Sequence, residues 1–340
     1  MKVSELGEFG LIRLLADIID KAKNPENISW QQALIGIGDD AAVWESDGTI
    51  QLATTDSLVQ DTHFDLSTTS WEELGWKAIA VNLSDIAAMG GIPRYALVSL
   101  ALPGELETAC IADLYRGMAQ IAGEFGVAIV GGNIARADKT MITATLLGSA
   151  EDKAVLTRSA AVSGDQVAVT GYLGLSAAGL RMLKQNLDFD AETSRLLRRA
   201  YLQPMPRVKE GQILLQQGVR AAIDISDGLI ADLAHVCEAS QTSARIRADS
   251  VPIHPTLEAR FEADCQRLAL TGGEDYELLF TASSQVVAQV RQAVSCPVTV
   301  VGEVTAGTPG RVTLLDSTGK SIPWQQGGWE HFKSKAPRPK

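Results

Sequence analysis

Four short segments of the chain place carboxylates next to glycines or at the end of an apolar run. The segments are IGIGDD, which ends at Asp40, ATTD, which ends at Asp56, NLSDIAAMG, which contains Asp85, and IDISDG, which contains Asp224 and Asp227. Carboxylate oxygens are hard ligands that suit Mg²⁺, and glycine lets the backbone approach a bulky ligand closely. Each segment by itself is also typical of a turn or a helix cap. It is their repetition along the chain that predicts a metal site.

Asp85 is the most informative of these carboxylates because it lies within a strongly apolar helical sequence. A carboxylate there is costly unless it is paired, hydrogen-bonded or bound to a metal. Metal ions held by carboxylates suit phosphoryl transfer, since they neutralise phosphate charge and align donor and acceptor. The Walker sequence GxxxxGK[ST] and the kinase sequences HRD and DFG do not occur. We therefore expect a nucleotide bound through aspartate-held metal ions.

Two further segments offer side chains that could contact a substrate. In LTGGEDYELLF two glycines precede Glu274, whose carboxylate could accept hydrogen bonds from a cationic or amine-bearing ligand. The same segment could instead be a tight turn before a strand. His63 follows the ATTD segment, and a lone histidine is more often a packed surface residue than a ligand. On the residues alone both alternatives stay open.

Hydrophobic periodicity predicts the elements that carry these residues. Apolar residues at helical spacing predict an amphipathic helix at Glu8–Lys21, and a Ser/Thr start followed by glutamates predicts a helix from about Trp71 to Met89. Ser226 is placed to cap a helix that follows IDISDG. Buried strands that end at polar clusters are expected at 50–57, 127–133 and 221–228, further strands at 140–150 and 163–174, and helices at 176–186 and 194–203.

Length and composition limit the possible classes of protein. A chain of 340 residues exceeds the usual single domain, so we expect two domains, residues 1–152 and 153–340, with a site at their junction. The net charge of −11 argues against a nucleic-acid partner, which needs clustered Lys and Arg. Four cysteines without a CxxC pair indicate neither a zinc site nor a disulfide framework. Without a signal peptide or an apolar span, a cytoplasmic protein with no membrane partner is expected.

The motifs GEFGLI, GIGDDAAV, TTDSLVQDTHF, NLSDIAAMGG, VGGN, LTRS, DISDGL and GGEDYEL occur in an order that resembles the thiamine-monophosphate kinase family. That family belongs to the superfamily of aminoimidazole ribonucleotide synthetase and selenophosphate synthetase. The resemblance implies an α/β fold of the α+β type with two domains, an N-terminal mixed-sheet domain that forms a homodimer interface and a C-terminal α/β domain. The implied reaction transfers the γ-phosphoryl group of ATP to thiamine phosphate, with several Mg²⁺ ions, and yields thiamine diphosphate.

The resemblance also implies roles for single residues, with Arg158, Asp56 and Asp227 as the catalytic ones. The acceptor is itself a phosphate dianion, so no general base is required. The implied metal ligands are Asp40, Thr54, Thr55, Asp56, Asp85, Asn133, Asp224 and Asp227. The implied nucleotide contacts are Gly132, Asn133, Arg158, Ser226 and Tyr115, and the implied contacts to the thiamine part are His63, Glu274 and Trp329.

Asn133 departs from the commonest family pattern, because VGGN carries it where many relatives have Asp. Asn can offer Mg²⁺ a carbonyl oxygen but no charge, so its role as a ligand is open.

Two alternatives to the kinase are another ATP-dependent enzyme of the superfamily and a non-catalytic regulator that binds nucleotide and metal. A selenophosphate synthetase is disfavoured because no cysteine precedes Cys110. The superfamily also includes a hydrogenase-maturation protein that dehydrates a carbamoyl group and needs a C-terminal cysteine, and it is disfavoured because the tail here ends in RPK.

Overall fold

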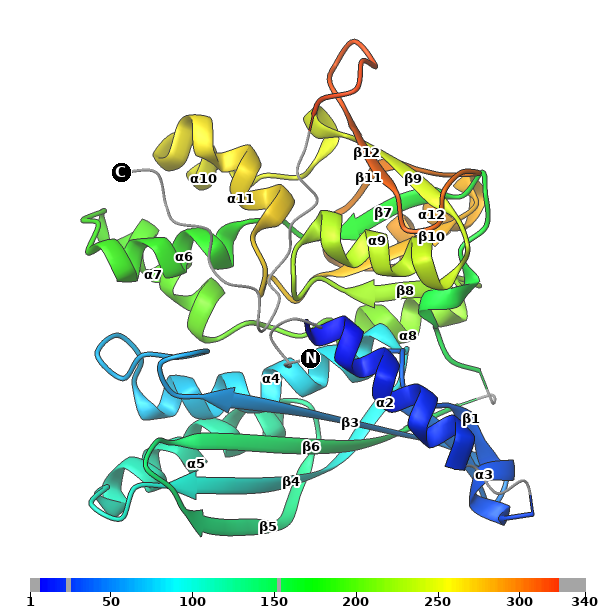
Figure 1. The fold of residues 1–340 in the computed structure, drawn as a ribbon. Coiled ribbons are helices and arrows are strands. Elements are labelled where there is room, and N and C mark those ends of the chain that lie inside the picture. The colour runs from blue at the N-terminus through cyan, green and yellow to red at the C-terminus, as the bar shows by residue number, and fades with distance from the viewer. Residues whose placement is uncertain (1–6, 23–25, 152–153, 324–340) are drawn as a thin grey trace.

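The computed structural model describes residues 7–22, 26–151 and 154–323, and within them it contains two six-stranded mixed sheets (Figure 1). The first sheet lies in the lower half of Figure 1 and the second in the upper half, with helix α4 (Trp71–Ala88) between them. The amphipathic helix predicted at 8–21 is α2 (Glu8–Ala22), which crosses the junction of the two halves. The chain thus has the α/β character predicted from its sequence.

The first sheet has the order β1-β2-β3-β6-β4-β5, and its neighbouring strands are antiparallel except for β4 and β5. Helices α4 and α5 (Thr108–Glu124) pack against each other, and α4 contacts β3, β4 and β6. Short helix α3 (Ile28–Gln32) precedes this sheet. Its strands are β1 (Ala33–Ile35), β2 (Ala42–Ser46), β3 (Thr49–Val59), β4 (Ile92–Leu102), β5 (Ala128–Arg136) and β6 (Met141–Ala150).

The second sheet has the order β12-β9-β11-β7-β10-β8 and is antiparallel except for the pair β12 and β9. Its strands are β7 (Gln166–Thr170), β8 (Ala221–Asp224), β9 (Ser243–Arg247), β10 (Leu278–Ala282), β11 (Val298–Thr305) and β12 (Val312–Leu315). The helices of this half are α6 (Leu175–Gln185), α7 (Ala191–Leu202), α8 (Val208–Gln216), α9 (Leu229–Ala239), α10 (Pro255–Phe261), α11 (Cys265–Thr271) and α12 (Ser284–Ala293).

Helix α4 forms where it was predicted because its start is encoded locally. Ser70 accepts a hydrogen bond from the backbone N–H of Glu73, and the Glu73 carboxylate accepts one from the N–H of Ser70, a reciprocal cap that satisfies free amides. Nearly all of the helix is buried, and it also contacts β8 and α8 of the second half. The buried core around α4 is therefore shared by both sheets, which holds Asp85 between them.

Two structural expectations are wrong. The apolar sequence at 127–133 was expected to be a buried strand, but β5 is an edge strand with mostly exposed residues, because β4 is its only neighbour in the described sheet. Ser226 does not cap α9; Gly228 is the residue at its N-terminus, and no side chain caps it there. The domain division at residues 152 and 153 stays a prediction. No described helix has the length and apolar character of a membrane span.

Candidate active site

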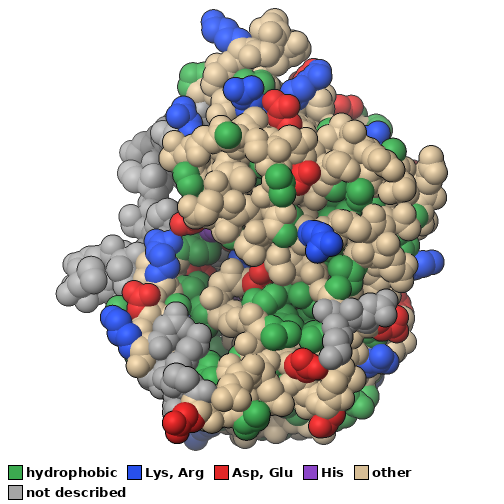
Figure 2. All heavy atoms as spheres, turned by 90° about the vertical axis from the view of Figure 1, so that its right-hand side faces the viewer, with side chains coloured by type: hydrophobic (Ala, Val, Ile, Leu, Met, Phe, Trp, Pro, Cys, Tyr) green, Lys and Arg blue, Asp and Glu red, His purple; other side chains and the backbone are tan. Residues whose placement is uncertain are grey.

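A cavity of about 1520 Å³ lies between the two halves of the molecule. Figure 2 shows the surface hollowed between the halves, with hydrophobic and acidic side chains visible there. The structure brings residues from both sheets, from α4 and from α2 to its walls. The residues with predicted roles that line the cavity are Asp40, Thr54, Thr55, Asp56, His63, Asp85, Arg158, Asp224, Ser226, Asp227 and Glu274.

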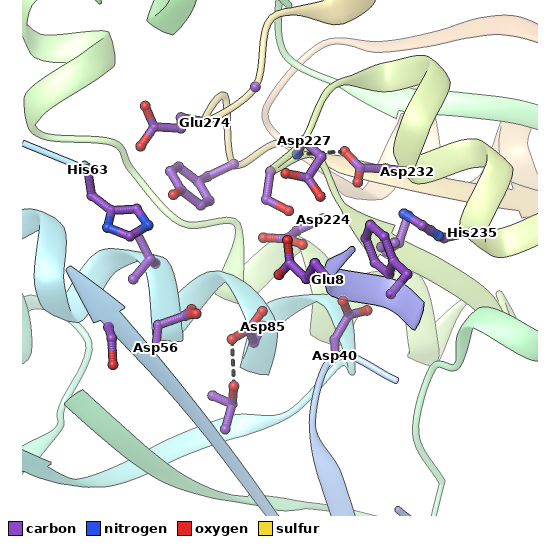
Figure 3. A pocket seen from close by; sticks show the side chains of 18 of the residues that line it. Glu8, Asp40, Asp56, His63, Asp85, Asp224, Asp227, Asp232, His235 and Glu274 are labelled. Carbon is purple, nitrogen blue, oxygen red and sulfur yellow. Dashed lines mark hydrogen bonds between the residues drawn. The ribbon is translucent and has the colours of Figure 1, made fainter. Parts of the chain in front are cut away.

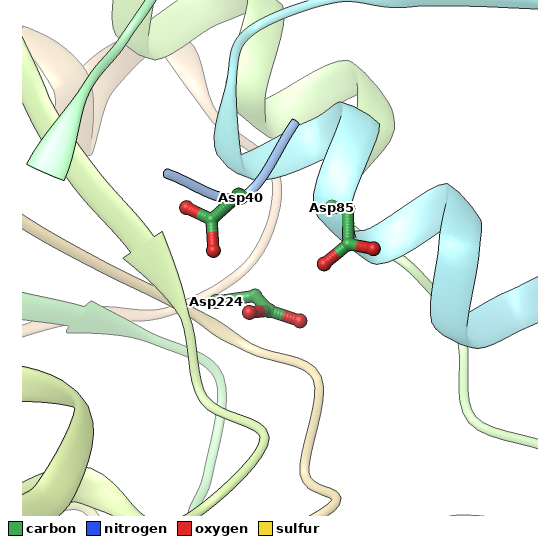
Figure 4. A group of neighbouring side chains, drawn as sticks. All are labelled: Asp40, Asp85 and Asp224. Carbon is green, nitrogen blue, oxygen red and sulfur yellow. The ribbon is translucent and has the colours of Figure 1, made fainter. Parts of the chain in front are cut away.

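Three of these aspartates form a compact group. One carboxylate oxygen from each of Asp40, Asp85 and Asp224 lies within 4.8 Å of the others (Figure 4). Asp40 precedes β2, Asp85 projects from α4, and Asp224 ends β8, so three separate elements supply the group. Thr54 donates a hydrogen bond to Asp85 (2.6 Å, dashed in Figure 3), and Ser84 donates one to Asp224 (2.6 Å). These hydroxyls fix the orientation of two of the carboxylates.

The crowding of buried negative charge perturbs these groups strongly. Burial, followed by the charge of Asp40, raises the pKa of Asp224 to about 7. Burial, followed by the charge of Glu8, raises the pKa of Asp227 to about 7, and burial and the neighbouring Asp56 raise the pKa of Asp85 well above its usual value. Ionising the whole group at neutral pH is therefore unfavourable, and a bound divalent cation would offset this cost.

The aspartate group fits a divalent cation for a second reason. Oδ2 of Asp40 is buried and has no hydrogen-bond partner among the described residues. An unpaired buried oxygen is unfavourable unless a ligand satisfies it. Three carboxylates converge here, and one of their oxygens has no hydrogen-bond partner among the described residues. Such hard oxygen donors are the ligands that Mg²⁺ prefers. The residues present therefore suit the metal that the sequence predicts.

Arg158 adds a positive charge beside the aspartate group. Its guanidinium is ion-paired with Asp40, with 3.1 Å between Nε and Oδ1, and its backbone N–H donates to Asp39 Oδ2 (3.2 Å). Although burial opposes it, the charge of Asp40 raises the pKa of Arg158. A guanidinium with five donors suits the oxygens of a phosphate group. Arg158 thus lies where it could contact both the aspartates and a bound phosphate.

The motifs DISDGL and GGEDYEL pack directly against each other. The backbone N–H of Glu274 donates to the carbonyl of Ser226 (2.8 Å). A Cβ at Gly273 would lie 2.3 Å from that carbonyl oxygen, so only glycine fits. Asp232 accepts hydrogen bonds from the backbone N–H groups of Asp227 (3.1 Å) and the following glycine (2.9 Å). The glycines in these motifs therefore serve close backbone packing, which brings Glu274 and Asp227 to one wall.

His63 lies on the far side of the cavity from Asp232 (Figure 3). Its Nδ1 accepts a hydrogen bond from the backbone N–H of Val59 (3.0 Å), which fixes the ring and leaves Nε2 as its N–H donor. Thr55, also at the wall, donates to the carbonyl of Ala144 (3.1 Å). His63 can thus present an N–H donor, and Thr55 is held by the neighbouring strand.

Three described residues with predicted roles do not line the cavity. Gly132 and Asn133 lie on edge strand β5, and Tyr115 lies on α5. Trp329 lies outside the described residues. Glu8, which had no predicted role, does reach the site: Figure 3 shows its side chain among the aspartates. Its position in GEFGLI, a motif of the resemblance, was the signal available in the sequence.

Comparisons with known proteins find a family model for each half of the chain. The family model "AIR synthase related protein, N-terminal domain" matches residues 38–150, and the model of the C-terminal domain matches residues 162–314. The thiamine-monophosphate kinase of Bacillus subtilis is 37% identical over 317 residues, which cover 91% of this chain and 97% of that protein. The Escherichia coli (strain K12) enzyme is 36% identical over 332 residues, or 96% and 98% of the two chains.

A solved structure described as AaThiL complexed with AMPPCP and TMP is 34% identical to the chain, with a TM-score of 0.85. The alignment covers 97% of this chain and 99% of that one. This match and the two family models confirm the predicted two-domain fold class. By identity and coverage, the chain belongs to the thiamine-monophosphate kinase family of AIR synthase related proteins.

Proposed function

We propose that the protein transfers the γ-phosphoryl group of ATP to thiamine phosphate and so produces thiamine diphosphate, in the biosynthesis of that cofactor. The observation that carries the proposal is the group of Asp40, Asp85 and Asp224 beside Arg158 in the cavity between the two halves. The names of the relatives and the AMPPCP and TMP of the similar structure support the same reaction. ATP as the phosphoryl donor is consistent with the expected cytoplasmic location.

In this proposal Mg²⁺ is held by the aspartate group and its neighbours. Bound Mg²⁺ would neutralise the triphosphate and help align the two phosphates. Thr54 acts through its hydrogen bond to Asp85 as well as through its own hydroxyl oxygen. The proposed ligands at the cavity are Asp40, Thr54, Thr55, Asp56, Asp85, Asp224 and Asp227.

The protein's own side chains supply position and charge. Arg158 contacts the transferring phosphoryl group, where a guanidinium stabilises charge that develops on its oxygens. Ser226 contacts the nucleotide from the wall that it shares with Asp227. Glu274 accepts hydrogen bonds from the amine-bearing ring of the acceptor, and His63 donates from Nε2 at the same end of the cavity. No residue removes a proton, because the acceptor is a phosphate dianion near neutral pH.

We extend the proposal to a homodimer formed through the first sheet. On β4, exposed Tyr95 (51%) and Leu97 (40%) alternate with buried Ala96 and Val98, so the side chains that point away from the core leave an apolar surface. Exposed apolar area of this kind is typical of an interface. Val130 and Ile134 on β5 and Met141 on β6 are exposed apolar residues as well.

The dimer would also explain why some residues with predicted nucleotide contacts do not line the cavity. Gly132, Asn133 and Tyr115 belong to the half that bears this surface, and none lines the cavity of its own chain. We propose that they reach the nucleotide bound to a second copy, where Asn133 offers a carbonyl oxygen to Mg²⁺.

The activity is tested by incubating the protein with ATP, Mg²⁺ and thiamine phosphate and separating the products. We expect thiamine diphosphate and ADP in equal amounts, with no product when Mg²⁺ is chelated. ATP binding without turnover would favour the non-catalytic regulator. ADP release with another acceptor only, such as an amidine precursor, would favour a different enzyme of the superfamily.

The dimer is tested by light scattering of the wild-type protein and of Leu97→Glu. The wild type should have twice the chain mass, and the charged variant should be monomeric. Val162→Glu is the matched control, because Val162 is exposed but lies in the second half of the chain. A monomeric wild type would contradict the dimer without affecting the proposed reaction.

A further inference from the structure

Lys77 is a buried cation to which no role has been given above. It lies on α4, eight residues before Asp85 and hence about two helical turns away. Its side chain is only 2% exposed, and it is among the largest fully buried side chains of the described residues. An ammonium group in such a place is strongly unfavourable unless it is paired. What Lys77 pairs with therefore indicates what it does.

Both partners of Lys77 come from the other half of the molecule. Its Nζ lies 2.7 Å from Oε1 of Glu274 and 3.9 Å from the centre of the Tyr201 ring. Nζ of Lys77 has no hydrogen-bond partner among the described residues, so its contact with Glu274 is an ion pair. The ring of Tyr201 offers its negative face to the ammonium group. One buried charge of α4 is thus bound by the GGEDYEL loop and by α7.

The partners of Lys77 line the cavity, whereas Lys77 does not. Glu274 is 29% exposed and has a backbone φ of 67°, a conformation that non-glycine residues adopt only when surrounding contacts hold it. Tyr201 donates a weak hydrogen bond to the carbonyl of His63 (3.4 Å). Figure 3 shows Glu274 and His63 on the side of the cavity away from Asp40 and Asp232. Lys77 therefore lies behind the wall that carries Glu274, on the side of the cavity away from Asp40.

Helices α4 and α7 are also held together by a contact that does not involve Lys77. One turn earlier on both helices, the guanidinium of Arg198 binds the carboxylate of Glu73 through two hydrogen bonds of 2.6 Å. This bidentate pair already ties the two helices together. Lys77 adds the contact with Glu274, which the Glu73–Arg198 pair cannot reach from its position. The contribution specific to Lys77 is thus the placement of the Glu274 carboxylate.

We propose that Lys77 is a positioning residue for the acceptor, which holds the Glu274 carboxylate and the Tyr201 ring where they meet its amine-bearing, cationic ring system. This inference rests on the proposed function and deepens it. The ion pair orients one carboxylate oxygen of Glu274 and leaves the other for the ligand. It also brings a positive charge close to the loop, so that Glu274 acts within a neutral pair and not as an isolated, partly buried anion.

The test measures steady-state kinetics for both substrates in Lys77→Met, Lys77→Arg, Glu274→Gln and the double variant Lys77→Met/Glu274→Gln. Lys77→Met should raise KM for thiamine phosphate about tenfold or more, the scale of one charged contact, and leave KM for ATP within about twofold. Lys77→Arg should restore part of the loss. The double variant should be no worse than Glu274→Gln, because both changes act through one carboxylate. Lys209→Met, an exposed lysine on α8, is the matched control.

Binding of thiamine phosphate without ATP, measured by calorimetry, should show the same order of variants. A wild-type enzyme without turnover would overturn the proposed function, and the binding series would still test Lys77. An active wild type with unchanged KM in Lys77→Met, or KM values that rise equally for both substrates, would overturn the inference alone. If Lys77→Met does not fold, Lys77→Arg and the double variant, which removes both charges of the pair, decide the question.

Discussion

The variant Asp224→Asn tests two effects of the aspartate group separately: its destabilisation of the metal-free fold and its role in turnover. Asn has the shape of Asp and keeps an oxygen that can accept the hydrogen bond from Ser84. It removes one of the three carboxylates that converge with Asp40 and Asp85. We expect a metal-free protein that is more stable than wild type at pH 8, together with a loss of turnover. The variant should thus gain stability because charge repulsion is relieved, and lose activity because a proposed metal ligand is removed.

The pKa of Asp224 sets the magnitude and the sign of the expected change in the free energy of unfolding. Burial and Asp40 raise this pKa from 3.8 to about 7 in the folded protein. The folded state then holds a proton that the unfolded state has lost, so stability is fully present below about pH 4 and falls as pH rises through 7. A shift of about three units sets an upper limit of ~4 kcal/mol at pH 8. Relaxation and water in the open cavity reduce the expected gain of Asp224→Asn to about 1–3 kcal/mol.

The assay is urea unfolding of both proteins at pH 5 and pH 8, in chelator and in Mg²⁺. In chelator the variant should gain stability over wild type at pH 8 and much less at pH 5. Mg²⁺ should stabilise the wild type, by about 2.7 kcal/mol at a hundred times its Kd, and the variant much less. Turnover of the variant should fall about a hundredfold or more. A variant less stable than wild type at pH 8 without metal, or equal stabilisation of both by Mg²⁺, would refute the reasoning.

Three further outcomes are expected. Asp56→Ala and Asp227→Ala should each abolish turnover and leave the circular dichroism spectrum unchanged, and wild-type rates in either would remove that residue from the metal site. Gly273→Ala should lower the free energy of unfolding by about 1–3 kcal/mol, because its Cβ would meet the Ser226 carbonyl at 2.3 Å; an unchanged urea midpoint would contradict this contact. Burial raises the pKa of Asp275 to about 8, so wild-type stability should fall as pH rises from about 4, the usual pKa of Asp, toward 8. Asp275→Asn should flatten this part of the profile, and equal slopes in both proteins would show that the carboxyl is not perturbed.

Features encoded by neighbouring residues could be predicted from the sequence. The start of α4 is an example, because Ser70 and Glu73 are three residues apart and cap the helix by themselves. The aspartates of the motifs could also be predicted, because an acidic residue in an apolar segment is unfavourable unless a partner compensates its charge. The strand at 127–133 was also correctly placed. Its burial was not, because burial depends on which strand lies next to it and no local pattern specifies that.

What the sequence by itself determined was the family, the kind of chemistry and the helix and strand segments that carry the motifs, because these depend on residue types and short spacings. Only the tertiary structure decided which of these segments share a site. Asp40, Asp85 and Asp224 meet because α4 packs between the two sheets. For the same reason the buried Lys77 reaches Glu274, and no sequence periodicity connects these two charges. Burial and the proximity of charge arise from long-range packing, and they raise the pKa values of the carboxylates at this site.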